Sequence, residues 1–135
     1  MGKVFSFGKK EKLKSRKQLA ELFGGKQSFF LFPLKVFYLE PSQVLDNNIK
    51  VGVGTNTRNF KKAVDRNRIK RLLREAYRIY KLPLHEHLAQ NNKQLVVFFL
   101  YVDKLLPQKE VLQSKMPQVI KELIKRLNEN VSQNT

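Results

Sequence analysis

The sequence predicts an α+β fold, a single-domain α-β sandwich in which helices pack on one central sheet. Two segments, residues 49–53 and 94–102, have the alternating or continuous apolar pattern of strands. Two others, residues 60–80 and 116–127, repeat apolar residues at helical spacing. At 135 residues the chain is long enough for one domain with its own core. We expect a mostly antiparallel sheet of about three to four strands and the element order α-β-β-α-β-α.

The first predicted helix follows a basic segment, residues 1–14, which we expect to be flexible. Ser15 and Gln18 form a capping-box pattern, and apolar residues at helical spacing follow as far as Phe23. Gly24-Gly25 predicts the end of this helix through a residue with positive φ.

The strands are predicted from their residue types and from the proline and polar residues that bound them. Residues 34–39 are aromatic and β-branched, and Pro33 separates them from a possible edge segment before it. Residues 49–53 alternate as a half-buried strand, and the polar loop 55–59 leads into the next helix. The segment after Pro83 is helical or irregular. Residues 94–102 are almost entirely apolar, which indicates a strand covered on both faces, with Phe98 and Phe99 in the core.

The last helix has a clear apolar stripe from Met116 to Leu127. Pro117 fits if it lies in the first turn. Residues 15–127 therefore form the domain, and residues 128–135 a polar tail.

The charge of the chain indicates a polyanionic partner. Lys and Arg number 27 against 11 acidic residues, a net charge of +16. Clustered charge of this size favours nucleic acid. The chain has no cysteine, which excludes disulfides and thiolate sites, and no signal-peptide pattern, so we expect a cytoplasmic protein. Its apolar runs are too short to span a membrane.

The helix at residues 60–80 has two opposed faces. Ile69, Leu72, Leu73, Ala76 and Tyr80 form the stripe that faces the core. The opposite side carries a cationic surface with too few acids nearby for ion pairs to account for it. Its members are Asn67, Lys70, Arg71, Arg74, Arg78 and Lys81, flanked by Arg66 and Arg68.

The run from Lys62 to Arg78, built around Arg66-Asn67-Arg68, closely resembles the signature of the bacterial ribonuclease P protein subunit. The resemblance extends over nearly the whole chain, including the predicted first helix, the strand at 34–39 and Val51-Gly-Val-Gly54. It implies a fold like that of domain 2 of ribosomal protein S5, with a left-handed βαβ crossover that general packing rules disfavour.

The resemblance also implies a function. Members of the family bind a large catalytic RNA, and the complex removes the 5′ leader of precursor tRNA. The RNA holds the catalytic magnesium, so we expect no catalytic residue, metal site or cofactor in the protein itself.

Two sets of site residues follow from the matching positions. The expected RNA-binding residues are Arg58, Lys61, Lys62, Arg66, Asn67, Arg68, Lys70, Arg71, Arg74 and Arg78. The expected cleft for the leader contains Leu19, Phe23 and Phe37. Leu19 stands where an aromatic residue is frequent in the family, and residues 57–60 depart from a common Ser-Lys-Lys run.

Several alternatives stay open at this point. Phe23 and Phe37 could be ordinary core residues. His85 and His87 could ligate a metal, although the sequence places no third ligand. The chain could also be a general RNA-binding or ribosome-associated protein, or a nuclease that acts without RNA.

Overall fold

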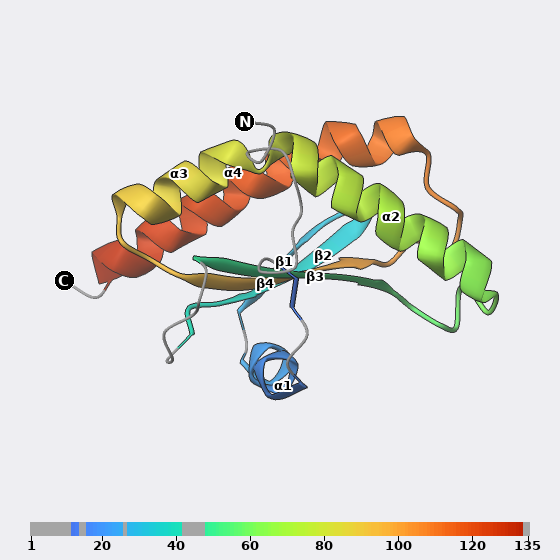
Figure 1. Ribbon diagram of the computed structural model, residues 1–135, viewed down its shortest axis with the longest axis horizontal. Helices are drawn as coiled ribbons and strands as arrows, with labels where there is room; N and C mark the ends of the chain where they lie inside the picture. The colour runs from blue at the N-terminus through green and yellow to red at the C-terminus, as the bar shows by residue number, and fades with distance from the viewer. Residues whose placement is uncertain (1–11, 14–15, 26, 42–47, 134–135) are drawn as a thin grey trace.

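The computed structural model describes residues 12–13, 16–25, 27–41 and 48–133, with side chains as far as residue 128. Ser15 and most of residues 1–14 lie outside this range. The elements follow one another along the chain as expected, with one additional strand and one additional helix (Figure 1). They are α1 (Arg16–Gly24), β1 (Ser28–Leu31), β2 (Leu34–Leu39), β3 (Ile49–Thr55), α2 (Ala63–Tyr80), α3 (Leu82–Gln90), β4 (Leu95–Tyr101) and α4 (Lys109–Gln133).

The strands form one four-stranded sheet in the order β1-β2-β4-β3. β1 pairs with β2, and β2 with β4, in antiparallel fashion, whereas β3 and β4 are parallel. The prediction of an α+β fold with a mostly antiparallel sheet is therefore confirmed. The segment before Pro33 is the edge strand β1. The connection from β3 to β4 passes through α2 and α3, and its left-handed sense stays a prediction.

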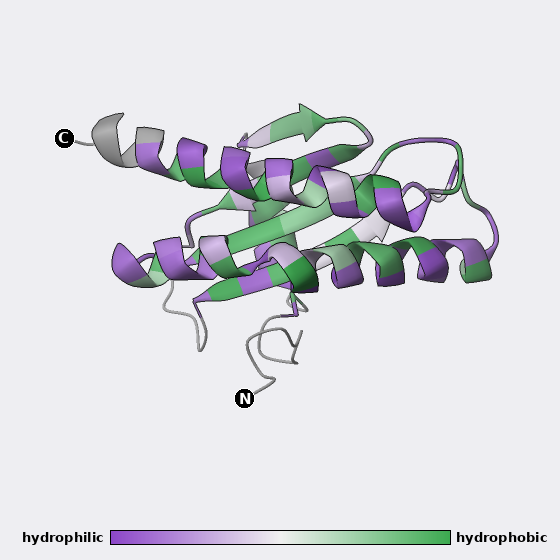
Figure 2. Cartoon of the chain, turned by 90° about the horizontal axis from the view of Figure 1, so that it is seen from above, coloured by the Kyte–Doolittle hydropathy of each residue, from purple (hydrophilic) through white to green (hydrophobic). Residues whose placement is uncertain are grey.

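Helices cover the two faces of the sheet unequally. α2, α3 and α4 lie together on one face, and the short helix α1 lies on the other (Figure 1). Seen from the side of the three helices, hydrophilic and hydrophobic residues alternate along α2 and α4 above largely hydrophobic strands (Figure 2). The main core fills this side, with Ile69 and Leu73 of α2, Leu123 of α4 and Val36 and Phe99 of the sheet all fully buried.

The face of β4 towards α1 is less covered than the sequence predicted. Leu95, Val97, Phe99 and Tyr101 are buried towards the three helices. On the opposite face only Val96 is buried, while Phe98 and Leu100 are half-buried. The prediction that Phe98 belongs to the core is wrong, because α1 has only nine residues and shields only part of this face.

Two details of the predicted helices are also wrong. The glycines after α1 do not stop it through positive φ, since no described glycine has a positive φ. Instead the Gly25 amide donates to the Glu21 carbonyl at 2.8 Å, which continues the helical pattern. Pro117 lies inside α4 and not in its first turn, because α4 begins at Lys109. The backbone of α4 also continues to Gln133, beyond the apolar stripe that ends at Leu127.

Candidate nucleic-acid interface

The start of α2 is held in place by its own arginine. Arg66 Nη1 donates to the carbonyl oxygens of Phe60, at 2.9 Å, and Lys61, at 2.7 Å. The ring of Phe60 is buried against Tyr101, with centroids 6.1 Å apart. Lys62 is the N-cap and makes no side-chain capping bond. The first turn of α2 therefore presents uncapped N–H groups beside Lys61, Lys62 and Arg58, all of which are exposed, an arrangement that attracts anions.

The outward side of α2 carries a row of exposed groups. Asn67, Arg68, Arg71 and Arg74 are exposed, and Lys70 beside them is half-buried. In the part of the chain that the structure describes, no carboxylate pairs with Arg68, Arg71 or Arg74. We call this row, Asn67, Arg68, Arg71 and Arg74, the cationic ridge. An exposed guanidinium group without a carboxylate partner can bind two phosphate oxygens at once.

Two residues that we expected on the cationic surface are not part of the ridge, because one is paired with a carboxylate and the other is buried. Arg78 donates to both carboxylate oxygens of Glu75, Nε at 3.2 Å and Nη2 at 2.5 Å. This hydrogen bond lowers the pKa of Glu75 and raises the pKa of Arg78. Lys81 is only 2% exposed, with Nζ 5.9 Å from the centroid of Tyr77, so its predicted place on the exposed surface is wrong. The reason is that α2 ends at Tyr80, and Lys81 lies in the junction with α3.

On the opposite face of the sheet, three phenylalanines meet between α1 and the strands. The Phe23 ring lies edge-on to Phe37, with centroids 5.0 Å apart, and to Phe98, at 5.2 Å. Phe23 is 48% exposed, so this aromatic cluster is open to solvent. Lys35 Nζ lies 5.2 Å from the centroid of Phe37 and adds a positive charge. Exposed rings beside a cation are the chemistry that binds unpaired bases.

The structure brings Phe23 and Phe37 together, as the sequence predicted, while their role in binding the leader stays a prediction. The sequence did not assign Phe98 and Lys35 to this cluster. The signal for Phe98 was the two-residue period of a strand. Phe99 shares the core face of β4 with Val97, so Phe98 must face the other way. The sequence predicted that Phe98 and Phe99 face opposite sides, but the continuous apolar run led us to expect both sides to be covered.

Leu19 contributes to a cavity beside the cluster that reaches around the edge of β3. The cavity has a volume of about 310 Å³. Its walls are Lys12, Leu13, Leu19, Val51, Gly52, Val53, Arg74 and Phe98. Leu13 lies along β3, its amide donating to the Val51 carbonyl at 2.8 Å. Because Arg74 belongs to α2 and Phe98 to the aromatic cluster, the cationic ridge and the cleft form one continuous surface.

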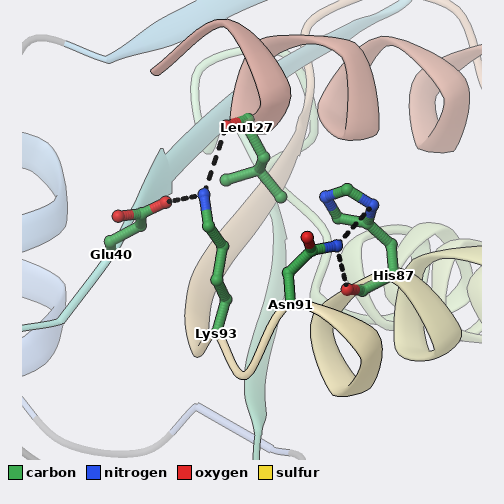
Figure 3. A network of polar contacts seen from close by, with 5 residues as sticks. All are labelled: Glu40, His87, Asn91, Lys93 and Leu127. Carbon is green, nitrogen blue, oxygen red and sulfur yellow. Dashed lines mark hydrogen bonds and ion pairs between the residues drawn. The ribbon is translucent and has the colours of Figure 1, made fainter. Parts of the chain in front are cut away.

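The two histidines have separate partners. His85 Nε2 lies 2.8 Å from the Tyr77 hydroxyl. His87 Nδ1 lies 3.3 Å from Asn91 Nδ2 (Figure 3). Among the described residues, no three His, Asp or Glu side chains come together as a metal site would require. No helix in the described ranges is long and apolar enough to cross a membrane.

Comparison with known proteins identifies the family of the chain. The family model described as Ribonuclease P matches residues 7–129. The chain belongs to the ribonuclease P protein family. As a ribonuclease P protein it is 32% identical over 113 residues to the ribonuclease P protein components of two strains of Porphyromonas gingivalis, ATCC 33277 and W83. Each alignment covers 84% of this chain and 82% of the relative.

Solved structures show the same fold. The ribonuclease P protein of Staphylococcus aureus superposes with a TM-score of 0.65 at 16% identity, covering 84% of this chain and 94% of that one. A mutant of that protein, described as defective in mRNA degradation activity, gives a TM-score of 0.65 at 15% identity over 84% and 87% of the two chains. At this identity the likeness supports the fold alone.

Proposed function

We propose that this ribonuclease P protein binds the catalytic RNA of ribonuclease P through the cationic ridge and the start of α2. We further propose that the cleft lined by Leu19, Phe23, Phe37 and Phe98 binds the single-stranded 5′ leader of precursor tRNA. The RNA supplies the magnesium-dependent chemistry, and the protein supplies binding and positioning. The site of action that we propose is the cytoplasm.

One observation carries this proposal, the continuity of the two surfaces through Arg74. An RNA helix along the ridge and a single strand in the cleft would meet at this residue. The ridge offers charge for phosphates, whereas the cleft offers rings for bases. A general RNA-binding protein would need the ridge but not an open aromatic cleft next to it.

Reconstitution with the catalytic RNA tests the proposal. The protein should accelerate cleavage of precursor tRNA at low magnesium concentration, and Arg71→Ala should weaken its affinity for the RNA. Lys125→Ala, which removes an exposed lysine from α4, is the matched control and should have little effect.

The leader site needs its own measurement. Phe23→Ala should reduce the preference for leader-bearing over mature tRNA while leaving affinity for the catalytic RNA unchanged. If wild-type protein binds the RNA but does not accelerate cleavage, the chain is a general RNA-binding protein. The division into two surfaces would be contradicted if Arg71→Ala and Phe23→Ala had equal effects on affinity for the catalytic RNA, or equal effects on the preference for leader-bearing tRNA.

A further inference from the structure

We propose that a second cavity, located where the β1–β2 turn meets the loop between β4 and α4, holds one unpaired base of the RNA bound at the start of α2. This inference rests on the proposed function. The cavity is distinct from the leader cleft, because it shares no lining residue with that cleft or with the cavity beside it.

The cavity has a volume of about 390 Å³ and mostly apolar walls. Its lining comprises Phe32, Pro33, Tyr101, Asp103, Leu105, Leu106, Pro107, Gln108, Val111 and Lys115. Several of these apolar side chains are exposed, among them Phe32 at 55% and Leu105 at 73%. Apolar groups exposed together in this way are typical of a binding site.

Hydrogen bonds hold the walls of this cavity in shape. The Tyr101 hydroxyl donates to the Leu105 carbonyl at 2.6 Å, and burial raises the pKa of Tyr101 to about 12, so the hydroxyl keeps its proton. The Val102 amide donates to the Pro33 carbonyl at 3.0 Å, and Asp103 Oδ1 accepts from the Lys104 amide at 2.7 Å. The cavity is therefore built into the fold.

The position of the cavity points to RNA as its occupant. Asn59 Nδ2 donates to the Asp103 carbonyl at 3.4 Å, which joins the loop before α2 to the cavity wall. In Figure 1 the start of α2 and the loop before α4 lie at the same end of the molecule. Arg58, on the same loop as Asn59, is exposed. RNA bound there would bring nucleotides to the mouth of the cavity.

The chemistry of the lining suits a nucleobase. Proteins bind unstacked bases by stacking on an aromatic ring and by polar contacts at the base edge. Phe32 offers the ring, and Asp103, Gln108 and Lys115 add acceptors and donors to the lining. A second copy of the chain is a poorer occupant, because each copy carries a net charge of +16 and the two would repel.

The test compares two neighbouring phenylalanines. Phe30 is 58% exposed, close to the 55% of Phe32, and the ring centroids are 6.2 Å apart, but Phe30 does not line the cavity. We expect Phe32→Ala to weaken affinity for the ribonuclease P RNA roughly 5- to 100-fold, the effect of losing one stacked base. Phe30→Ala should change the affinity less than twofold. Phe32→Trp, which keeps an aromatic ring at this position, should bind the RNA with the affinity of the wild-type protein.

The salt dependence separates stacking from phosphate binding. Phe32→Ala should leave the slope of log K against log salt unchanged, whereas Arg71→Ala should reduce it by about 1. Chemical probing of the RNA should show one unpaired nucleotide that wild-type protein and Phe30→Ala protect and Phe32→Ala does not.

The outcomes separate the two proposals. If wild-type protein neither binds nor activates the RNA, the proposed function fails and this inference with it. Suppose instead that wild-type protein activates the RNA and Arg71→Ala binds it more weakly, but Phe32→Ala and Phe30→Ala bind it with equal affinity. Only the proposal of a base-binding cavity is then overturned. A change in oligomeric state with Phe32→Ala, at unchanged RNA affinity, would also overturn it and assign the surface to self-association.

Discussion

Phe98 occupies the space that a side chain at Gly52 would need. A Cβ atom on Gly52 would lie 2.6 Å from Cδ2 of Phe98, closer than real contacts allow. Gly54 has the same relationship to Phe98, with 2.7 Å to Cζ. The ring can therefore lie against the backbone of β3 only because these residues are glycine. This position places the ring beside Phe23, where it forms part of the cleft.

Replacing Gly52 with alanine should displace the Phe98 ring. We expect the free energy of unfolding to fall by about 1–3 kcal/mol, the usual cost of overpacking, because Phe23 limits where the ring can move. The preference for leader-bearing over mature tRNA should fall as well. Urea unfolding and binding of the two tRNA forms measure these effects. Gly24→Ala is the control, since a Cβ there meets no atom within 4 Å. Identical results for the two variants would show that the ring is not confined.

Arg66 should matter for stability as well as for RNA binding. Arg66→Ala removes the donor to the Phe60 and Lys61 carbonyls, and we expect a loss of about 1 kcal/mol in the free energy of unfolding, since the site is partly exposed. Arg71→Ala should change stability by less than about 0.5 kcal/mol, as is usual for exposed residues. Urea unfolding together with RNA titration separates the two. A stable Arg66→Ala protein with weakened RNA binding would assign Arg66 to the interface alone.

Leu19→Phe should strengthen binding of the leader. Leu19 lines the cavity that contains Phe98, so a ring at this position would add a surface for stacking. We expect a several-fold gain in affinity for leader-bearing tRNA and no change for mature tRNA, measured with the reconstituted complex. Ala20→Phe places a ring at an exposed position next to it in α1 and should give no such gain. Equal behaviour of the two variants would contradict a leader contact at Leu19.

His87 should make the fold less stable in mild acid. Burial and the nearby charge of Lys93 lower the pKa of His87. Its Nε2 atom is buried without a partner among the described residues, and Lys93 is held in place by Glu40 and the Leu127 carbonyl, each 3.2 Å from Nζ (Figure 3). The folded state therefore binds a proton on His87 more weakly than the unfolded chain does, where the ordinary pKa is about 6.5. Its contribution to stability is complete above that pH and is lost as the pH falls towards the folded-state pKa.

Urea unfolding between about pH 7.5 and 5.5 measures this effect. Stability of the wild-type protein should decline over the range, and His87→Gln should decline less. His85 is present in both proteins, so its own titration cancels in the comparison. Parallel declines would show that His87 is not the group responsible.

The elements that local pattern defines were predictable. The two-residue alternation of β3 and the helical stripe of α2 each depend only on neighbours in the chain, so the sequence located both. Errors arose where distant segments decide the outcome. Tyr77 is fully buried although it was not assigned to the stripe, because α2 packs against both the sheet and α4 and so buries a wider face. Lys81 is buried because it lies in the junction between α2 and α3, where the apolar and cationic sides of α2 no longer apply.

The sequence by itself determined the fold class, the family and the cationic side of α2, because periodicity and charge are properties of the chain. Only the tertiary structure decided which aromatic rings stay open to solvent and which surfaces meet. Phe98 becomes part of the cleft because α1 is too short to cover the sheet and because the neighbouring strand has glycine where the ring lies. Arg74 joins the ridge to the cleft because α2 packs beside the edge strand β3, an arrangement set by long-range packing.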